Sequence, residues 1–337
     1  MGILYSVIVP TFNRAEQLRL TLTAFELQTF VQFEVIVIDD CSTDVTAEVV
    51  KEFSGKYPLQ YIRVEERRGQ GVARNIGASY AKGDILIFCD ADLLVLPSFL
   101  ADFHLLHSQH KNAIISGTPY CFNMVFTHYF PDFSRRERKL FRDIVGRTDS
   151  SKKVTPVIKP EDLRSNFNCI YPLVRQWEIV PDNVKEAFLN TEVAPWLLFI
   201  TRCVSIPKDI FLHERGFDDR LIRGEDWEFG YRLYKKGYTF KSVGKTVGFH
   251  QEHPQQRRKP HFSHPPFYVF LYEKFGMADP ELALLSLWDS SDDLWNHIHE
   301  YKKVLTKEQS EERNLLFLAC EKLAVRRLAE YRSKLIK

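Results

Sequence analysis

The sequence predicts an α/β protein with a mostly parallel sheet flanked by helices, followed by a helical C-terminal extension. Up to Ser116, short β-branched runs alternate with amphipathic stretches, which is typical of a parallel sheet covered by helices. The expected strands are Tyr5–Val9, Glu34–Ile38, Leu59–Val64, Asp84–Cys89 and Ala113–Ser116. The expected helices are Ala15–Thr29, Thr43–Phe53, Gly71–Ala81 and Pro97–His110.

The domain boundaries follow from where this alternation holds and where it stops. Residues from about 120 to 195 are rich in Phe, Tyr, Pro and Arg and lack periodicity, which indicates an insertion or a substrate-binding region. Order returns with Leu197–Pro207, followed by a helix around Asp226–Lys236 and by the segments Tyr238–Val243 and Thr246–His250. We therefore expect a sheet domain over residues 1–254 and a helical extension over residues 255–337.

The composition is typical of a globular protein and argues against a membrane-spanning, a thiolate zinc-binding or a nucleic-acid-binding protein. Of the 337 residues, 45% are hydrophobic and 27% are charged, and no apolar run is long enough for a membrane span. The six cysteines form no CxxC pair, so we expect a reducing, cytoplasmic location and no thiolate zinc site. A net charge of +2 gives no general attraction for nucleic acid. The apolar run near the N-terminus lacks a basic leader, and we interpret it as the first strand.

Acidic residues follow two of the expected strands. Asp39 and Asp40 follow the second strand, and Asp90-Ala91-Asp92 follows the fourth. Ligands of open α/β sheets bind at these carboxyl ends. Carboxylates repel an anionic ligand unless a cation lies between them. A Mg²⁺ or Mn²⁺ ion bound by a carboxylate and by diphosphate oxygens would be such a cation. The alternative is that Asp-x-Asp only caps the next helix.

The turn after the first strand argues against a dinucleotide-binding enzyme. It reads Pro10-Thr11-Phe12-Asn13-Arg14 and contains no glycine, whereas a dinucleotide fold places a glycine-rich turn there. The nearest glycine pattern, Gly69 to Arg74, follows the third strand and ends in arginine. We therefore exclude a dehydrogenase.

A third acidic cluster, Gly224-Glu225-Asp226-Trp227-Glu228, lies at an expected helix start. Acidic residues are favoured there by the helix dipole and by capping alone. The functional interpretation is a general base that takes the proton of an acceptor hydroxyl.

Four segments together resemble a known family. The segments SVIVPTFNR, VIVIDDCSTD, GVARNIGASYAKGDILIFCDAD and GFDDRLIRGEDWEFGYRL are similar, in order and spacing, to the GT-A domain of glycosyltransferase family 2, a Rossmann-like fold that binds nucleotide sugars. The resemblance covers roughly residues 4–125 and 197–250. One motif alone is weak, but four in register are not expected by chance.

The resemblance implies roles for individual residues. It makes Asp226 the catalytic base with Glu225 beside it, Asp92 the principal metal ligand, and Asp40 the partner of the base, typically uracil, while Asp39 shapes the turn. It implies that Asp90 contacts ribose or metal. The nucleotide-binding set is Pro10, Thr11, Asn13, Arg14, Asp40, Arg74, Asp90 and Ala91.

Two further residue types have both a functional and a packing interpretation. His250 has the placement of a metal ligand in some relatives of this fold, although most lone histidines pack or face solvent. His250 and His253 form one His-x-x-His pair, and His261 and His264 form another. Two such pairs without a cysteine are a poor signature of a structural zinc site. Trp227 adjoins the expected base, and we interpret it as a sugar-binding ring, with core packing as the alternative.

The sequence therefore predicts an inverting, metal-dependent transfer of a sugar from a nucleoside-diphosphate sugar, with a UDP-sugar as the expected donor, to an acceptor hydroxyl. The rivals are a non-catalytic nucleotide-sugar-binding scaffold, a sugar nucleotidylyltransferase and a retaining transferase. The region of about 120–195 is assigned to the acceptor side. The acceptor, a glycan, lipid or other molecule, stays open, as does the role of the extension in dimerisation, peripheral membrane contact or acceptor binding.

Overall fold

A computed structural model describes residues 2–147, 151–175, 182–189, 194–221, 223–254, 267–276, 282 and 311–335. The chain divides into two compact units. The first comprises Met1–Trp177 and Leu198–Gln256, and the second comprises Glu178–Leu197 and Arg257–Lys337. The single boundary at residue 254 that the sequence suggests stays a prediction.

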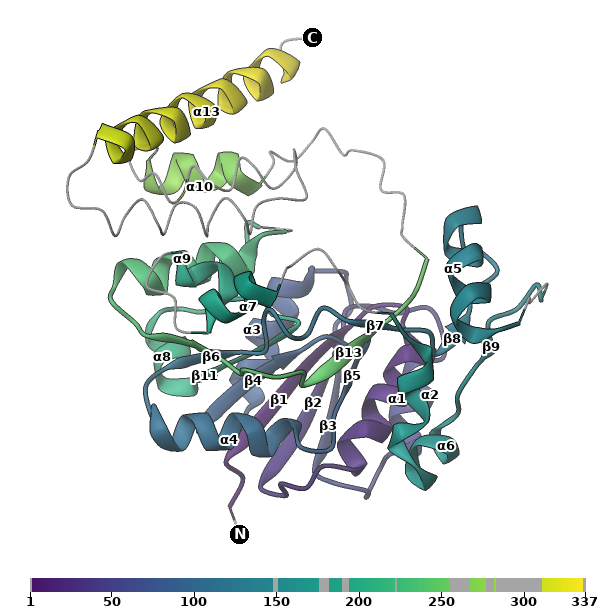
Figure 1. The fold of residues 1–337 in the computed structure, drawn as a ribbon. Helices are drawn as coiled ribbons and strands as arrows, with labels where there is room; N and C mark the ends of the chain where they lie inside the picture. The colour runs from purple at the N-terminus through teal and green to yellow at the C-terminus, as the bar shows by residue number, and fades with distance from the viewer. Residues whose placement is uncertain are drawn as a thin grey trace. The chain divides into compact units, whose positions relative to one another are not determined.

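The first unit is built on a seven-stranded sheet in the order β12-β6-β11-β4-β1-β2-β3 (Figure 1). The strands are β1 (Tyr5–Thr11), β2 (Phe33–Asp39), β3 (Leu59–Arg63), β4 (Ile85–Cys89), β6 (Ile114–Ser116), β11 (Cys203–Pro207) and β12 (Phe240–Ser242). All neighbours pair in parallel except β11, which is antiparallel to both β4 and β6. The mostly parallel α/β sheet predicted from the sequence is thus confirmed.

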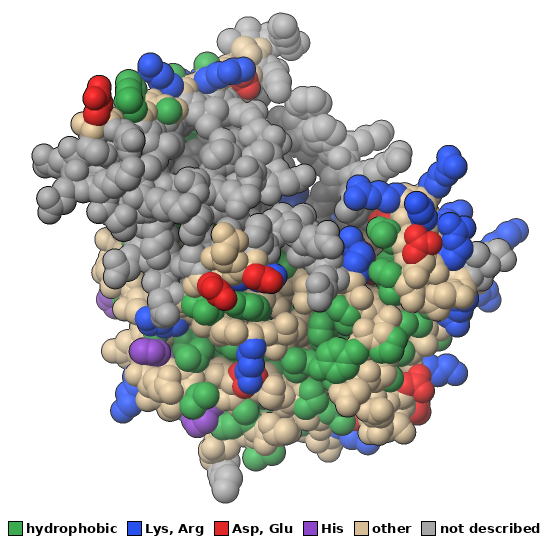
Figure 2. Space-filling model, in the orientation of Figure 1, with side chains coloured by type: hydrophobic (Ala, Val, Ile, Leu, Met, Phe, Trp, Pro, Cys, Tyr) green, Lys and Arg blue, Asp and Glu red, His purple; other side chains and the backbone are tan. Residues whose placement is uncertain are grey.

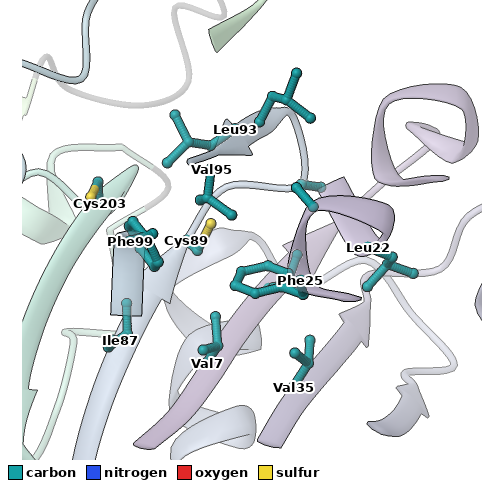
Figure 3. Close-up of a cluster of buried hydrophobic side chains, with 14 of the residues drawn as sticks. Val7, Leu22, Phe25, Val35, Ile87, Cys89, Leu93, Val95, Phe99 and Cys203 are labelled. Carbon is teal, nitrogen blue, oxygen red and sulfur yellow. The ribbon is translucent and has the colours of Figure 1, made fainter. Parts of the chain in front are cut away.

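Helices cover both faces of the sheet because its strands are apolar on both faces. The helices are α1 (Ala15–Glu26), α2 (Thr46–Glu52), α3 (Gln70–Tyr80), α4 (Phe99–Gln109), α8 (Lys208–His213) and α9 (Glu225–Lys235). On one face Val7, Val35 and Ile87 pack with Phe25 of α1 and Phe99 of α4 (Figure 3). The alternate residues point the other way, as the two-residue period of a strand requires.

On that opposite face α3 approaches the sheet closely. A Cβ atom at Gly77 would lie 2.5 Å from Cγ2 of Ile8 and 3.2 Å from Cγ1 of Ile38, so only glycine fits between helix and sheet. Beside it, Phe88 contacts Phe211 and Phe217 with ring centroids 5.2 and 5.1 Å apart. This packing fixes α3 over the carboxyl ends of the central strands.

A second, four-stranded sheet brings a late segment to the end of β4. Its order is β10-β7-β13-β5, with β10 at Val174–Arg175, β7 at Met124–Val125, β13 at Gly248–Gln251 and β5 at Leu93–Val95. The backbone N–H of Gln251 donates to the Asp92 carbonyl at 2.8 Å. Its buried side-chain amide donates to Thr21 Oγ1 at 3.0 Å and accepts from Thr127 Oγ1 at 2.9 Å. These bonds fix β13 beside Asp92.

The segment without periodicity contains short elements. They are β8 (His128–Tyr129), α5 (Arg135–Val145), β9 (Thr155–Pro156), α6 (Pro160–Ser165) and a 3₁₀ helix (Phe167–Leu173). Phe126, Tyr129, Phe133 and Phe141 form a small core around α5. Helix α5 begins with a capping box of Ser134 and Glu137 and buries Phe141. Figure 2 shows Lys and Arg side chains gathered where α5 lies in Figure 1, and Arg135, Arg136 and Arg138 of this helix are exposed.

The described part of the second unit is helical, as predicted for the C-terminal extension. It contains α7 (Asp182–Phe188), α10 (Phe267–Phe275) and α13 (Glu311–Leu335), and a 3₁₀ turn, Pro195–Leu198, leads back into the first unit. Within the ranges described, no helix has the length and apolar character needed to cross a membrane. His261 and His264 lie outside the described residues.

Candidate active site at the strand ends

Hydrogen bonds join the loops after β1 and β2 at the edge where these strands end. The backbone N–H of Asn13 donates to Ser42 Oγ at 2.9 Å, and its side-chain oxygen accepts from the N–H of Thr43 at 2.8 Å. Thr11 is buried, and its hydroxyl has no hydrogen-bond partner in the described chain. A buried hydroxyl without a partner is costly, so Thr11 fits a position where a nucleoside supplies that partner.

The two carboxylates after β2 bind the protein itself. Asp39 accepts from the N–H of Ser42 at 2.8 Å and from the Tyr61 hydroxyl at 2.6 Å, as expected of a residue that shapes the turn. Asp40 accepts from the backbone N–H groups of Arg68 and Gly69 at 2.7 and 3.0 Å. Asp40 therefore anchors the loop that leads into α3, and its contact with a base stays a prediction.

Arg74 joins two distant parts of the acidic edge. Its guanidinium is 1% exposed and donates to Asp90 Oδ1 and to Glu225 Oε1, both at 2.9 Å. Glu225 is itself buried, and burial together with the charge of Asp226 raises its pKa to about 7, although Arg74 acts in the opposite direction. Asp90 and Glu225 are therefore held by the arginine, which connects the end of β4 with the start of α9.

Asp226 is arranged differently from its neighbour Glu225. It is half-buried, and its carboxylate accepts from the N–H of Trp227 at 2.9 Å and lies 3.5 Å from both the N and Oγ1 of Thr201. No cation of the described chain forms an ion pair with it. Burial raises the pKa of this carboxyl, with Arg74 opposing, which suits a group that accepts a proton.

Asp92 meets two histidines of the β13 segment. His250 Nε2 lies 3.3 Å from Oδ1 of Asp92, and His253 Nε2 lies 3.3 Å from Oδ2. The ligand atoms of the three residues all lie within 4.8 Å of one another. Burial acts to raise the pKa of Asp92, but His250, His253 and Arg14 outweigh it and lower the pKa overall. Burial lowers the pKa of His250 to about 3, although the charge of Asp92 acts in the opposite direction.

One carboxylate and two imidazoles form a donor set that fits a divalent metal ion. Imidazole and carboxylate ligands together suit manganese better than magnesium, which prefers oxygen ligands alone. Asp90, named as a second ligand from the sequence, lies outside this cluster because Arg74 binds it. Its role as a ligand stays a prediction.

The remaining sequence-predicted residues lie at the same edge with different exposure. Arg14 Nε is 3.8 Å from Asp92 Oδ2. Pro10 is buried within β1, paired with Ile38, and the Ala91 carbonyl accepts from Thr21 Oγ1 at 2.9 Å. Trp227 is 7% exposed, so little of its ring surface is available to a sugar.

Sequence reasoning missed two residues of this edge. His253 was visible only as half of a His-x-x-His pair, and its approach to Asp92 depends on β13 pairing with β5. Arg202 precedes β11, and its backbone oxygen accepts from the N–H of Asp90 at 3.2 Å. No sequence motif surrounds Arg202, and its place depends on the antiparallel pairing of β11 with β4.

Comparison with known proteins assigns the family. Residues 6–156 match the family model described as Glycosyl transferase family 2. The chain is 28% identical over 258 residues to the uncharacterized glycosyltransferase YfnE of Bacillus subtilis, covering 74% of this chain and 65% of that protein. It is 30% identical over 293 residues to validoxylamine A glucosyltransferase of Streptomyces hygroscopicus, covering 85% and 63%. The matched part, residues 6–156, belongs to glycosyl transferase family 2, a family of glycosyltransferases.

A further relative and a solved structure agree with this assignment. The chondroitin synthase of Escherichia coli is 30% identical over 258 residues, covering 74% of this chain and 35% of that protein. The structure of TarS 1-349 of Staphylococcus aureus in complex with UDP-GlcNAc superposes with a TM-score of 0.52 at 18% identity, covering 94% of this chain and 79% of the other. At that identity the likeness concerns the fold, which is the predicted GT-A fold. The chain spans about two thirds or less of the three relatives' lengths.

We predict that Arg74→Met destabilises the protein by about 3–5 kcal/mol, because the buried carboxylate of Glu225 then faces the partly exposed carboxylate of Asp90 without a cation. The free energy of unfolding in urea measures the change. Arg19→Met is the matched control, since Arg19 also binds two carboxylates, Glu16 and Glu52, but at the surface, where such pairs contribute about 1 kcal/mol or less. Equal losses in the two variants would contradict a special role for Arg74.

Proposed function

We propose that this protein is an inverting glycosyltransferase that moves a sugar from a nucleoside diphosphate, specifically from a UDP-sugar, to an acceptor hydroxyl. The observation that carries the proposal is the position of Asp226, a half-buried carboxylate without an ion-pair partner in the described chain, at the sheet edge that also carries the cluster of Asp92, His250 and His253. A proton acceptor and a candidate metal site at one edge are what this reaction requires.

The relatives support a UDP-sugar as the donor but do not indicate a single class of acceptor. The TarS structure contains UDP-GlcNAc, and the names of relatives refer to chondroitin, validoxylamine A and poly(ribitol-phosphate). These acceptors share hydroxyl groups and differ in almost everything else. For this chain we therefore propose a hydroxyl acceptor in a glycan, a lipid-linked molecule or a smaller compound.

Asp226 acts as the general base in this proposal. It removes the proton of the acceptor hydroxyl while the hydroxyl oxygen bonds to the anomeric carbon. The bond between that carbon and the diphosphate oxygen breaks, and its electron pair leaves with the nucleoside diphosphate. Attack occurs from the face opposite the leaving group, so the configuration inverts. Glu225 and Asp90, both bound to Arg74, position the start of α9 and the end of β4 around the sugar.

Asp92, His250 and His253 would hold a manganese ion in this proposal. Such an ion would neutralise negative charge on the diphosphate leaving group. Arg14, beside Asp92, adds a positive side chain on the same side. The proposed metal is Mn²⁺ rather than Mg²⁺ because two of the three ligands are imidazoles.

A second candidate function is a nucleotide-sugar-binding scaffold without turnover. It would use the same loops after β1 and β2. A scaffold gives no reason for a carboxylate at Asp226 that forms no ion pair within the described residues, whereas a transferase needs such a carboxylate as its base. We therefore favour the transferase, and turnover with a nucleotide sugar distinguishes the two.

We predict that Asp226→Asn lowers the rate of sugar transfer or of slow donor hydrolysis by about 10²–10⁴-fold, the usual contribution of a general base. Donor affinity, measured by calorimetry with UDP, should change less than about threefold, since the amide keeps the size of the side chain. Asp219→Asn is the control, because Asp219 lies in the same motif and is exposed. Unchanged turnover in Asp226→Asn would exclude Asp226 as the base.

We predict that Asp92→Ala and His253→Ala each weaken Mn²⁺ binding at least about tenfold, as loss of a metal-site residue commonly does. Electron paramagnetic resonance of free Mn²⁺ gives the affinity without any turnover. In the native protein, UDP with Mn²⁺ should raise the melting temperature more than UDP with Mg²⁺.

The control for the metal experiment is Asp143→Ala, which removes an exposed carboxylate of α5. Equal Mn²⁺ affinity in Asp92→Ala and in Asp143→Ala would exclude the Asp92 cluster as the metal site. Absence of any melting response to UDP or GDP in the native protein would contradict the proposed function itself.

A further inference from the structure

Arg202 lies at the acidic edge, directly after Thr201 and before β11. Its backbone oxygen accepts from the N–H of Asp90, and the next residue along, Cys203, pairs with Cys89 at the end of β4. The preceding residue, Thr201, lies 3.5 Å from the carboxylate of Asp226. Arg202 is therefore placed by the backbone where the reacting part of a donor would lie.

The side chain of Arg202 lacks partners that the other arginines of the edge have. Its Nε and Nη1 atoms are buried and have no hydrogen-bond partner, and no carboxylate of the described chain lies within ion-pair distance of it. Arg74, by contrast, binds two carboxylates at 2.9 Å, and Arg14 lies 3.8 Å from Asp92. Arg202 is thus the arginine at this edge whose charge is not used within the described protein.

The protein partly compensates for this unpaired charge. The guanidinium carbon lies 5.6 Å from the centroid of the Phe122 ring, a contact that attracts a cation but satisfies no N–H donor. Asp90 and His250 are near enough to interact electrostatically with Arg202 but do not bond to it. Buried donors without acceptors destabilise a folded chain, so Arg202 suits a site completed by a ligand.

We propose that Arg202 forms an anion-binding subsite that takes an anionic oxygen group of the sugar donor. A guanidinium offers parallel N–H donors that match the two oxygens of a phosphate or a carboxylate. The subsite rests on the proposed transferase function. If it binds the diphosphate, Arg202 adds a positive charge beside the leaving group, in addition to the proposed metal ion. The anionic group is either the diphosphate, present in every donor, or a carboxylate on the sugar, present only in acidic sugars.

The experiment compares the native protein with Arg202→Met, which keeps the length of the side chain and its contact with Phe122. Melting temperature is measured without ligand, and affinities are measured with Mn²⁺ for uridine, UDP, UDP-glucose and UDP-glucuronate. We expect Arg202→Met to melt no lower than the native protein, because an unpaired charge is lost. We expect UDP to bind at least about tenfold more weakly, since charge-assisted bonds to the anion are lost, while uridine affinity is unchanged.

The donor series identifies the anion. A loss shared by UDP and both UDP-sugars assigns the subsite to the diphosphate, and a loss confined to UDP-glucuronate assigns it to a sugar carboxylate. Arg202→Lys should restore part of the affinity, because lysine keeps the charge but not the paired donors. Arg164→Met is the control, since Arg164 is bound to Glu26 away from the strand ends.

Two results would overturn the subsite. In the first, Arg202→Met melts lower and binds all ligands as the native protein does, which is the behaviour of a structural arginine. In the second, uridine and UDP weaken equally, which indicates an indirect effect on the nucleoside pocket. If the native protein binds no nucleoside diphosphate, the proposed function fails along with the subsite, whereas tight native binding with an unaffected variant removes the subsite alone.

Discussion

The buried bridge from Arg74 to Asp90 and Glu225 is the interaction on which the rest of the edge depends. It connects residues 151 positions apart in the sequence and brings the start of α9 to the end of β4. Without a cation between them, the two carboxylates would repel each other, and the buried one, Glu225, would resist desolvation. Because the bridge places Glu225, it also sets the direction in which the next residue, Asp226, faces the edge.

The carboxylates of this edge divide into two groups by what they bind. Asp39, Asp40 and Glu225 accept hydrogen bonds from backbone, tyrosine or arginine donors of the fold. Asp92 meets two histidines, and Asp226 meets no cation of the described chain. A dense acidic edge can thus be stable and still keep carboxylates for ligands, since hydrogen bonds within the fold stabilise the first group. The proposed chemistry uses the second group.

Local sequence patterns predicted the elements, and long-range pairing decided the details of the site. The β-branched runs of the first strands and the acidic residues after them are local signals, and the structure confirms the parallel sheet that they indicate. His253 and Arg202 reach the site through β13 on β5 and β11 on β4, pairings of short strands far apart in the chain. Periodicity carries no information about such pairings. The backbone donors that bind Asp40 are likewise invisible in a residue pattern.

The most direct test of the central claim is an anomalous diffraction measurement on crystals grown with Mn²⁺ and a UDP-sugar. We expect the manganese peak between Asp92, His250 and His253, with diphosphate oxygens completing the coordination and the anomeric carbon facing the carboxylate of Asp226. A manganese peak away from Asp92, or a sugar bound beyond the reach of Asp226, would contradict the proposed site and its chemistry.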